Sequence, residues 1–424
     1  MDCPNKYNGH NIHGGRNVDI RVKDIIIHQD FINRSQIDIE WAIRLNRCIL
    51  RIVGLWPQDS NNSRETLLPK LRLLFNVITL IFVLTIPAVM SLIRVWGDMI
   101  LMIDNLQYTL PLLITVLKVS IMWCKKKALS SLIDMIVRDW MRVKVKEERK
   151  IMLKRARNTR VLALCGGVMI LFTLLITIPA FFGLTVRHVT NLTNPGKPLL
   201  IQAYYLHDVS KSPQFELTFL VQAIALTLSG LSYTGIDNFL GLLILHICGQ
   251  MENLHLRLLN LGNNPNFKAA LKFNVKDHIR LIRSIEVVDN TFDLMLLGLL
   301  FLFGILFCLH GFLIINVVNQ GGHLSFMQLT SYILASVCVL MHMCLYCAVG
   351  EFLVTQSEKI HCATYEYIWY NLEAKAARNM LIMLRAKKPL HITAGKIFPM
   401  TMITFCNLLK TSAGYVSVLL ANRD

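Results

Sequence analysis

Long apolar runs interrupt this chain seven times, and each run is long enough to cross a lipid bilayer as a helix. An α-helix rises 1.5 Å per residue, so about 20 apolar residues cross a hydrocarbon core of ~30 Å. The runs cover residues 75–93, 100–123, 161–186, 217–245, 294–318, 327–352 and 397–420. The sequence therefore predicts an all-α integral membrane protein with seven transmembrane helices.

The basic residues are concentrated in alternate segments between these runs. Of the 44 Lys and Arg, 37 lie before the first run or in the connections that follow the second, fourth and sixth runs. Lys and Arg are retained on the cytoplasmic side of membranes, so we expect the N-terminus in the cytoplasm and the C-terminus outside the cell. G-protein-coupled receptors also have seven spans, but their N-terminus lies outside, which would put the basic connection 125–160 on the wrong side. That class is therefore excluded.

Composition and motifs argue against a soluble enzyme. Apolar residues make up 54% of the chain, above the roughly 45–50% of soluble proteins. The sequence has no Gly-rich phosphate loop, HExxH helix or GxSxG elbow, so we expect no enzyme activity and no cofactor. The net charge of +17 fits a cytoplasmic surface facing anionic membrane lipid and requires no nucleic acid partner. The nearest metal candidates are interpreted as packing residues on an apolar helix, so no metal is expected; they are His342, Cys344, Cys347 and Cys362.

Several runs continue as helices beyond the expected membrane boundary. The periodicity of the fourth run extends to Leu259, a periodic segment 275–293 precedes the fifth run, and 357–384 follows the sixth. Their apolar stripes need a common partner, which predicts a packed intracellular domain. Residues 1–35 lack periodicity and are expected to form a mobile arm, whereas 41–52 have helical spacing. That helix packs on the bundle or lies among the inner lipid headgroups, and the sequence leaves both open.

These patterns divide the chain into six expected parts. They are a cytoplasmic arm with an amphipathic helix (1–72), transmembrane helices one to four (73–245), cytoplasmic anchor helices (246–293), transmembrane helices five and six (294–355), a cytoplasmic anchor segment (356–396), and a pore-lining last helix with a short outer tail (397–424). The longest outer connection contains the sequon Asn191-Leu192-Thr193, which makes Asn191 a candidate glycosylation site.

Ionisable residues inside the runs must face protein or water, because each costs ~2.5–3.5 kcal/mol at the centre of a helix. Asp237 and Lys410 are such residues; either they pair within the bundle or Lys410 faces a water-filled conduit. Asp104 lies near the outer end of its run and is interpreted as interfacial. The last run is unusually polar, with Thr401, Thr404, Asn407, Lys410, Thr411, Ser412 and Ser417. Such a helix predicts a pore formed where several copies meet.

Short sequences spread over the chain resemble the insect odorant receptors, in the style of their ant and wasp members. The combination near the C-terminus is the most specific, and other similarities lie upstream. The segments are Arg44-Leu45-Asn46-Arg47, Gly54-Leu55-Trp56-Pro57, Asp208-Val209-Ser210, Gly249-Gln250-Met251-Glu252-Asn253-Leu254, Tyr346-Cys347, Gly350-Glu351, Ala363-Thr364-Tyr365-Glu366, Ile392-Thr393-Ala394-Gly395-Lys396 and Lys410-Thr411-Ser412.

This resemblance implies an odorant-gated cation channel in the plasma membrane of sensory-neuron dendrites, built as a heterotetramer with the odorant receptor coreceptor. It implies that the cytoplasmic helix extensions anchor the subunits to one another and that the last helix lines the pore. The family's hydrophobic gate lies three residues after a Tyr of this helix, which gives Val418, with Ser417 beside it. The coreceptor has a long insertion in the second intracellular connection. Residues 262–275 are short here, which implies a tuning subunit for olfaction rather than the coreceptor.

The family's odorant pocket lies in the outer half of the bundle among helices two to six, and its residues follow no motif. We therefore selected candidates by depth and side-chain type, because apolar and aromatic walls suit a small volatile odorant. The candidates are Tyr108, Phe172, Ile176, Phe219, Ala223, Phe307 and Tyr332.

Two other functions remain open, a gustatory receptor of the same superfamily and a membrane transporter. Gustatory receptors typically end their last helix with Thr-Tyr-x-x-x-x-x-Gln-Phe, whereas this chain has Gly414-Tyr415 followed by Val416. A transporter should show two related halves or paired broken helices, and the sequence shows neither. Both comparisons favour the odorant receptors.

Overall fold

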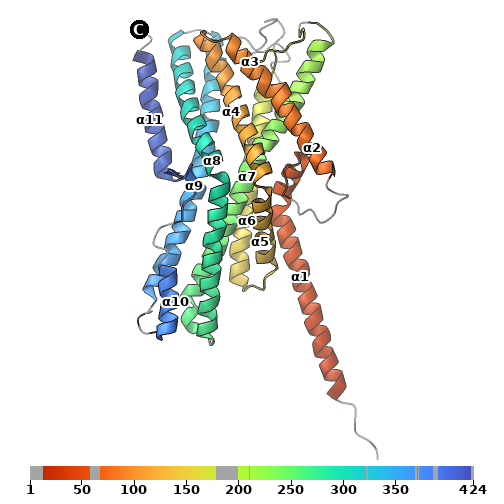
Figure 1. Cartoon of the computed structure of the whole chain (residues 1–424), viewed down its shortest axis with the longest axis vertical. Coiled ribbons are helices and arrows are strands. Elements are labelled where there is room, and N and C mark those ends of the chain that lie inside the picture. The colour runs from red at the N-terminus through yellow and green to blue at the C-terminus, as the bar shows by residue number, and fades with distance from the viewer. Residues whose placement is uncertain are drawn as a thin grey trace, which may run out of the picture.

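The computed structural model is a bundle of long helices that run side by side along one axis (Figure 1). The structure describes residues 13–57, 67–177, 199–209, 211–320, 323–367, 370, 372–384 and 390–421. The N-terminal half contains α1 (His13–Ile52), α2 (Leu67–Ile78), the π-helix η1 (Thr79–Thr85), α3 (Ile86–Arg94), α4 (Met99–Cys124), α5 (Lys126–Met141) and α6 (Lys146–Thr177). The C-terminal half contains α7 (Gln214–Leu259), the 3-10 helix η3 (Leu261–Asn263), α8 (Phe267–Gln320), α9 (His323–Glu366), α10 (Ala374–Leu384), strands β1 (Thr393–Ala394) and β2 (Phe398–Pro399), and α11 (Met402–Ala421).

The predicted spans correspond to helices in the predicted order. Within the described residues, five segments are long and apolar enough to cross a membrane, and they contain most of runs one, two, four, five and six. They are Leu67–Arg94, Met99–Cys124, Gln214–Leu259, Phe267–Val318 and Tyr332–Glu366. The third run begins in α6 and continues beyond the described residues, and the seventh lies in α11, which has 20 residues. The all-α fold class is therefore confirmed.

The first span runs from α2 through η1 into α3, and its middle is a π-helix. Pro87 contributes to this irregularity, because proline has no N–H group for the carbonyl four residues earlier. The carbonyl oxygen of Val83 instead accepts a hydrogen bond from the phenol of Tyr205 at 3.0 Å. The hydroxyls of Thr79 and Thr85 donate to backbone oxygens within the same span. The segment around Tyr205 is thereby fastened to the first span.

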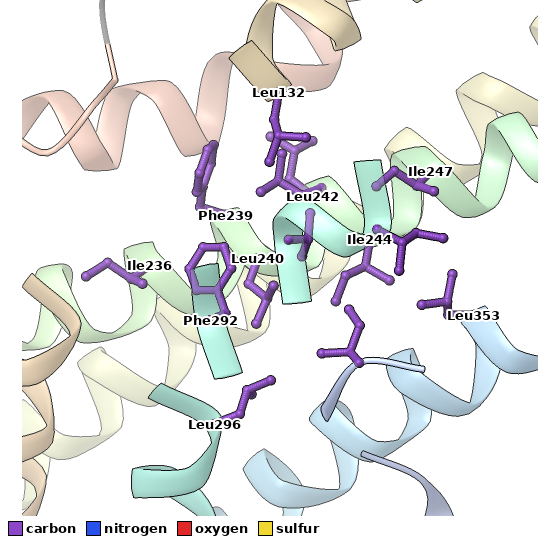
Figure 2. Packing of buried hydrophobic residues seen from close by; sticks show 14 of the residues in the cluster. Leu132, Ile236, Phe239, Leu240, Leu242, Ile244, Ile247, Phe292, Leu296 and Leu353 are labelled. Carbon is purple, nitrogen blue, oxygen red and sulfur yellow. The ribbon is translucent and has the colours of Figure 1, made fainter. Parts of the chain in front are cut away.

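α7 lies at the centre of the bundle. Its residues between Gly235 and Met251 are almost all buried, and a helix that is apolar on every side needs neighbours on every side. Gly241 lets α6 approach closely, because an added Cβ would lie 2.3 Å from Cδ2 of Leu162. Figure 2 shows the resulting core, where α7 meets side chains from α5, α8 and α9; the labelled residues are Leu132, Ile236, Phe239, Leu240, Leu242, Ile244, Ile247, Phe292, Leu296 and Leu353.

The helix extensions expected beyond the membrane are present. α7 continues to Leu259, and the predicted segment 275–293 is continuous with the fifth span in α8. The single helix expected over 357–384 is wrong, because α9 ends at Glu366 and α10 is a separate helix. The break lets α10 bury its apolar stripe, including Met380 and Met383, beside α8 and α9. A straight continuation of α9 would leave that stripe without a partner.

The prediction that the N-terminal residues form a mobile arm needs correction. Helix α1 begins at His13, so the mobile arm predicted for residues 1–35 is wrong from that residue on. No proline interrupts residues 13–56, and adding residues to a helix that is already formed costs little. The C-terminal part of α1 packs on the bundle, with Leu50 fully buried and Asp38 bonded to Arg149 of α6 at 2.7 Å. Of the two alternatives for this helix, packing on the bundle is the one observed.

The last helix begins at Met402 rather than at residue 397. Residues 393–399 form a hairpin in which Thr393 lies opposite Pro399. Its turn contains Gly395 and Lys396, both with a φ of 61°. The apolar run is therefore not helical at its start, because Phe398 and Pro399 form the strand that pairs with Thr393 and Ala394.

Candidate functional site

One predicted ligand residue, Tyr332, belongs to a separate apolar cluster in the bundle. Its side chain is buried with Ile103 of α4 and with Phe312 and Leu313 of α8. The Tyr332 hydroxyl lies 3.3 Å from Oδ1 of Asp104. Asp104 is only 5% exposed and lies near the N-terminal end of α4, so its side chain faces the interior of the bundle. A carboxylate at this depth needs polar neighbours, and Tyr332 supplies one.

The other predicted ligand residues lie on α4, α6, α7 and α8. Tyr108 and Phe307 are half-buried at the edge of the main core, and Phe219 lies 6.1 Å from the ring of Phe215 on α7. Ala223 follows one turn later and is half-buried. Tyr108 and Phe307 therefore pack on the main core and Tyr332 belongs to the separate cluster, whereas Phe219 and Ala223 are in neither. The side chains of Phe172 and Ile176 lie outside the described part of the structure, and so does Asn191.

Asp237 lies at the junction of three helices. Its Oδ1 is 2.5 Å from Nζ of Lys118 on α4, and its Oδ2 is 3.0 Å from Nε2 of His342 on α9. Lys118 is fully buried and lies 3.2 Å from the ring centre of Tyr233. His342 stacks on Tyr346 with ring centres 5.3 Å apart. Asp237 therefore pairs with Lys118 and His342 rather than with Lys410, and it ties α4, α7 and α9 together.

One face of α11 packs on α8. Ser412 is buried, with its Oγ 3.5 Å from the carbonyl oxygen of Gly304, and its own carbonyl oxygen is 3.7 Å from Sγ of Cys308. At Gly311 an added Cβ would lie 2.8 Å from Val416, so glycine allows the two helices to approach. Figure 1 shows α11 at the edge of the bundle, with α8 and α9 on its inner side.

The opposite face of α11 is exposed and largely polar. Asn407, Thr411, Gly414 and Val418 recur at helical spacing along it, and all four are exposed. The two flanking predicted residues are exposed as well, namely Lys410 and Ser417. Val418 is 57% exposed. Amide and ammonium groups are costly in lipid, so this face requires water or another protein chain.

The hairpin before α11 is held by α8 and α9. Asp289 of α8 accepts hydrogen bonds from the backbone N–H of Thr393 at 2.7 Å and from Nζ of Lys396 at 2.5 Å. On α9, Oε2 of Glu351 accepts from the N–H of Met402 at 3.3 Å. Glu351 of one resemblance segment contacts the first residue of the last helix, and residues 392–396 of another form the hairpin just before it, although about 40 residues separate the two segments.

The helix extensions beyond the expected membrane boundary are joined by a network of ion pairs. Asp139 of α5 contacts His246 of α7 at 3.1 Å and Arg280 of α8 at 2.7 Å. Asp277 contacts Arg257 at 2.5 Å and Arg280 at 2.8 Å. Burial alone would raise the pKa of Asp139, but the hydrogen bond and charge of His246 and the charge of Arg280 outweigh it and hold the pKa below its ordinary value. Sequence reasoning predicted that these helices pack together but did not identify this network.

Comparison with known proteins places these features in a family. The family model of the 7tm odorant receptors matches residues 98–413. Odorant receptor 13a of Drosophila melanogaster is 25% identical over 279 residues, which cover 61% of this chain and 64% of that protein. Odorant receptor 10 of Aedes albopictus is 28% identical over 220 residues, 50% of this chain and 57% of that protein. The match thus spans less than two thirds of both relatives. Odorant receptor Or2 of Anopheles gambiae is 23% identical over 359 residues, 80% of this chain and 89% of that protein.

Solved structures of an insect olfactory receptor have the same fold. OR5 from Machilis hrabei in complex with eugenol aligns with a TM-score of 0.75 at 18% identity, covering 90% of this chain and 98% of that one. A second structure of the same receptor gives a TM-score of 0.75 at 17% identity, covering 92% of this chain and 99% of that one. These alignments support the seven-helix fold, and the family match extends over most of the chain. This protein therefore belongs to the insect odorant receptor family, which comprises receptors and not enzymes.

Proposed function

We propose that this protein is the odorant-binding subunit of an odorant-gated cation channel and assembles with the odorant receptor coreceptor as a heterotetramer. The observation that carries the proposal is the exposed polar face of α11. One helix cannot enclose a pore, so this face needs equivalent helices around a symmetry axis. A water-filled pore then solvates Asn407, Lys410 and Thr411. Val418, with Ser417 beside it, forms part of the apolar constriction.

The proposed orientation places the N-terminus and the ends of α5 and α10 in the cytoplasm. In Figure 1, α10 and the N-terminal part of α1 extend to the end of the bundle opposite the C-terminus. Most basic residues belong to the segments at that end, which supports its assignment to the cytoplasm. Residues 246–293 and 356–396 would form the anchor between subunits, and the protein would reside in the plasma membrane of sensory-neuron dendrites.

The proposed odorant pocket occupies the other half of the bundle. Its walls would include Tyr108, Phe172, Ile176, Phe219, Ala223, Phe307 and Tyr332, which are apolar or aromatic as a small volatile ligand requires. The binding of eugenol by OR5 from Machilis hrabei supports a small organic ligand for this chain as well.

α8 offers a direct route from this pocket to the pore. Phe307 and Phe312 contribute to the two apolar clusters, and the neighbouring Gly304, Cys308 and Gly311 face α11. A displacement of α8 on ligand binding therefore reaches α11 directly. Because packed helices are close to incompressible, the shift is transmitted instead of being absorbed.

Current recordings test this function. The full chain is expressed with an insect odorant receptor coreceptor, and whole-cell current is recorded across a panel of volatile compounds. We expect odour-evoked cation current that requires both chains and whose odorant preference differs from that of the coreceptor alone. A surface-expressed chain that leaves the preference of the coreceptor unchanged across the panel would contradict the proposal.

A further inference from the structure

Lys410 is the only charged residue of α11. The helix Met402–Ala421 contains no Asp, Glu or Arg and no second Lys. Its 20 residues make it about 30 Å long, which matches the thickness of a hydrocarbon core. Lys410 is eight residues from the start of the helix, about 12 Å along its axis. Lysine reaches lipid headgroups only from positions near a helix end, so the ammonium group of Lys410 stays at membrane depth.

The side chain of Lys410 leaves α11 on the side opposite α8. Ser412 is buried against α8, and the two residues that separate it from Lys410 correspond to about 200° of rotation around the helix. Lys410 is exposed, as are Asn407 and Thr411 on the same side. Figure 1 shows α8 and α9 on the inner side of α11 only. The described part of this chain therefore leaves the Lys410 side of the helix uncovered.

Lys410 has no counter-charge within the described residues. The carboxylate that α11 does contact belongs to Glu351, which accepts from the N–H of Met402, about 12 Å along the helix from Lys410. Lys118 provides the contrast, because Asp237 lies 2.5 Å from its ammonium group in the interior of the bundle. The charge of Lys410 therefore acts on the space beside α11 without a neighbouring carboxylate to cancel it.

We infer that Lys410 is a selectivity-determining residue of the pore and disfavours divalent cations relative to monovalent ones. Coulomb repulsion is proportional to the charge of the ion, so a divalent cation passing Lys410 meets twice the repulsion of a monovalent one. Charged side chains around a pore select ions in this way, and the low dielectric of the surrounding helices strengthens their field. This inference rests on the proposed function, which places α11 around a cation pore, and it adds which cations the pore favours.

Reversal potentials test the role of the charge. The chain is expressed with the coreceptor, and odour-evoked current is recorded with sodium or calcium as the main external cation. Lys410→Gln should raise the ratio of calcium to sodium permeability about two- to fivefold, the effect of one unit charge within several ångströms in water. Lys410→Glu should raise it further, and Lys410→Arg should leave it unchanged. Lys150→Gln is the matched control, because it neutralises an exposed lysine of α6 far from α11 in the chain.

Chemical restoration of the charge provides a second measurement. Lys410→Cys should show the raised calcium permeability of Lys410→Gln. Treatment with aminoethyl methanethiosulfonate adds an ammonium group to the new thiol and should return the ratio to the wild-type value, whereas neutral methyl methanethiosulfonate should not. Treated wild type controls for the exposed native thiol of Cys406. A permeability ratio that follows neither neutralisation, reversal nor restoration of the charge would overturn the inference.

Surface labelling separates a role in selectivity from a structural one. Absence of the uncharged variants from the cell surface would assign Lys410 a structural contact in the assembled channel and would also overturn the inference. Odour-evoked current whose permeability ratio ignores the charge at residue 410 would leave the channel function standing. Absence of any odour-evoked current from surface-expressed wild type with the coreceptor would overturn both.

Discussion

Lys118 is a fully buried cation whose counter-charge is Asp237, and the other carboxylate oxygen of Asp237 contacts His342. Removing one member of a buried ion pair leaves an uncompensated charge and costs about 3–5 kcal/mol, whereas replacing both charges is often nearly neutral. The loss of Lys118 differs from the loss of Asp237, because the Asp237 carboxylate keeps its contact with Nε2 of His342 when Lys118 is removed. Removing Lys118 and removing Asp237 should therefore destabilise the protein by different amounts.

We expect Asp237→Asn to destabilise the protein by about 3–5 kcal/mol, because Lys118 then lacks a counter-charge. Lys118→Met should cost less, and the double change Lys118→Met with Asp237→Asn should recover most of the loss. The measurement is the melting temperature of the detergent-solubilised protein. Lys211→Met is the control, since its pairing with Asp208 is exposed and worth at most about 1 kcal/mol. Equal melting temperatures of the Asp237→Asn and Lys211→Met proteins would show that the buried pair does not stabilise the fold.

Val418 is the residue on which the gate proposal depends. An apolar ring excludes water from a narrow pore, so Val418→Asn should stabilise water there and raise the current without odorant or alter cation selectivity. The effect will be partial if coreceptor subunits supply most of the ring. Leu220→Asn provides the control, because Leu220 is an exposed apolar residue of α7. Unchanged basal current, permeability and block in a Val418→Asn channel at normal surface level would remove Val418 from the gate.

The hairpin 393–399 is the element that fixes where α11 begins. Its attachment depends on Asp289, which accepts hydrogen bonds from the N–H and hydroxyl of Thr393 and from Lys396. The backbone N–H of Thr393 has an oriented carboxylate partner on α8, so a shift of α8 moves the hairpin with it. The element thus provides a second connection between α8 and α11, besides the direct contact at Ser412.

Asp289→Ala should loosen this connection by about 1–3 kcal/mol, because it leaves the Thr393 N–H without its partner. We expect a lower maximal odour-evoked current at equal surface level, with odorant preference unchanged. Lys396→Met removes only the partly exposed ion pair and should change the current little. Similar currents from the Asp289→Ala and wild-type channels would exclude the hairpin from coupling.

At the scale of the whole molecule, the charge distribution sets the orientation of the bundle. We expect the 37 basic residues of one set of segments to keep those segments in the cytoplasm. An epitope tag before Met1 should therefore be hidden in intact cells and become accessible after permeabilisation. A tag after Asp424 should be accessible without permeabilisation. The reverse pattern of accessibility would contradict the orientation and, with it, the assignment of the anchor and the outer pocket.

The sequence by itself determined the class of the protein, the number and order of its spans and the helical extensions beyond the membrane. These are local properties, since apolar length and charge are readable from each segment alone. It could not determine that Lys118, Asp237 and His342 meet, because contact between distant positions depends on how each helix is rotated about its axis. The hairpin before Met402, the packing of α10 as a separate helix beside α8 and α9, and the burial of Gln202 likewise follow from neighbours that no local pattern encodes. Tertiary packing decided them, because only the assembled bundle specifies which polar groups leave water and what they meet there.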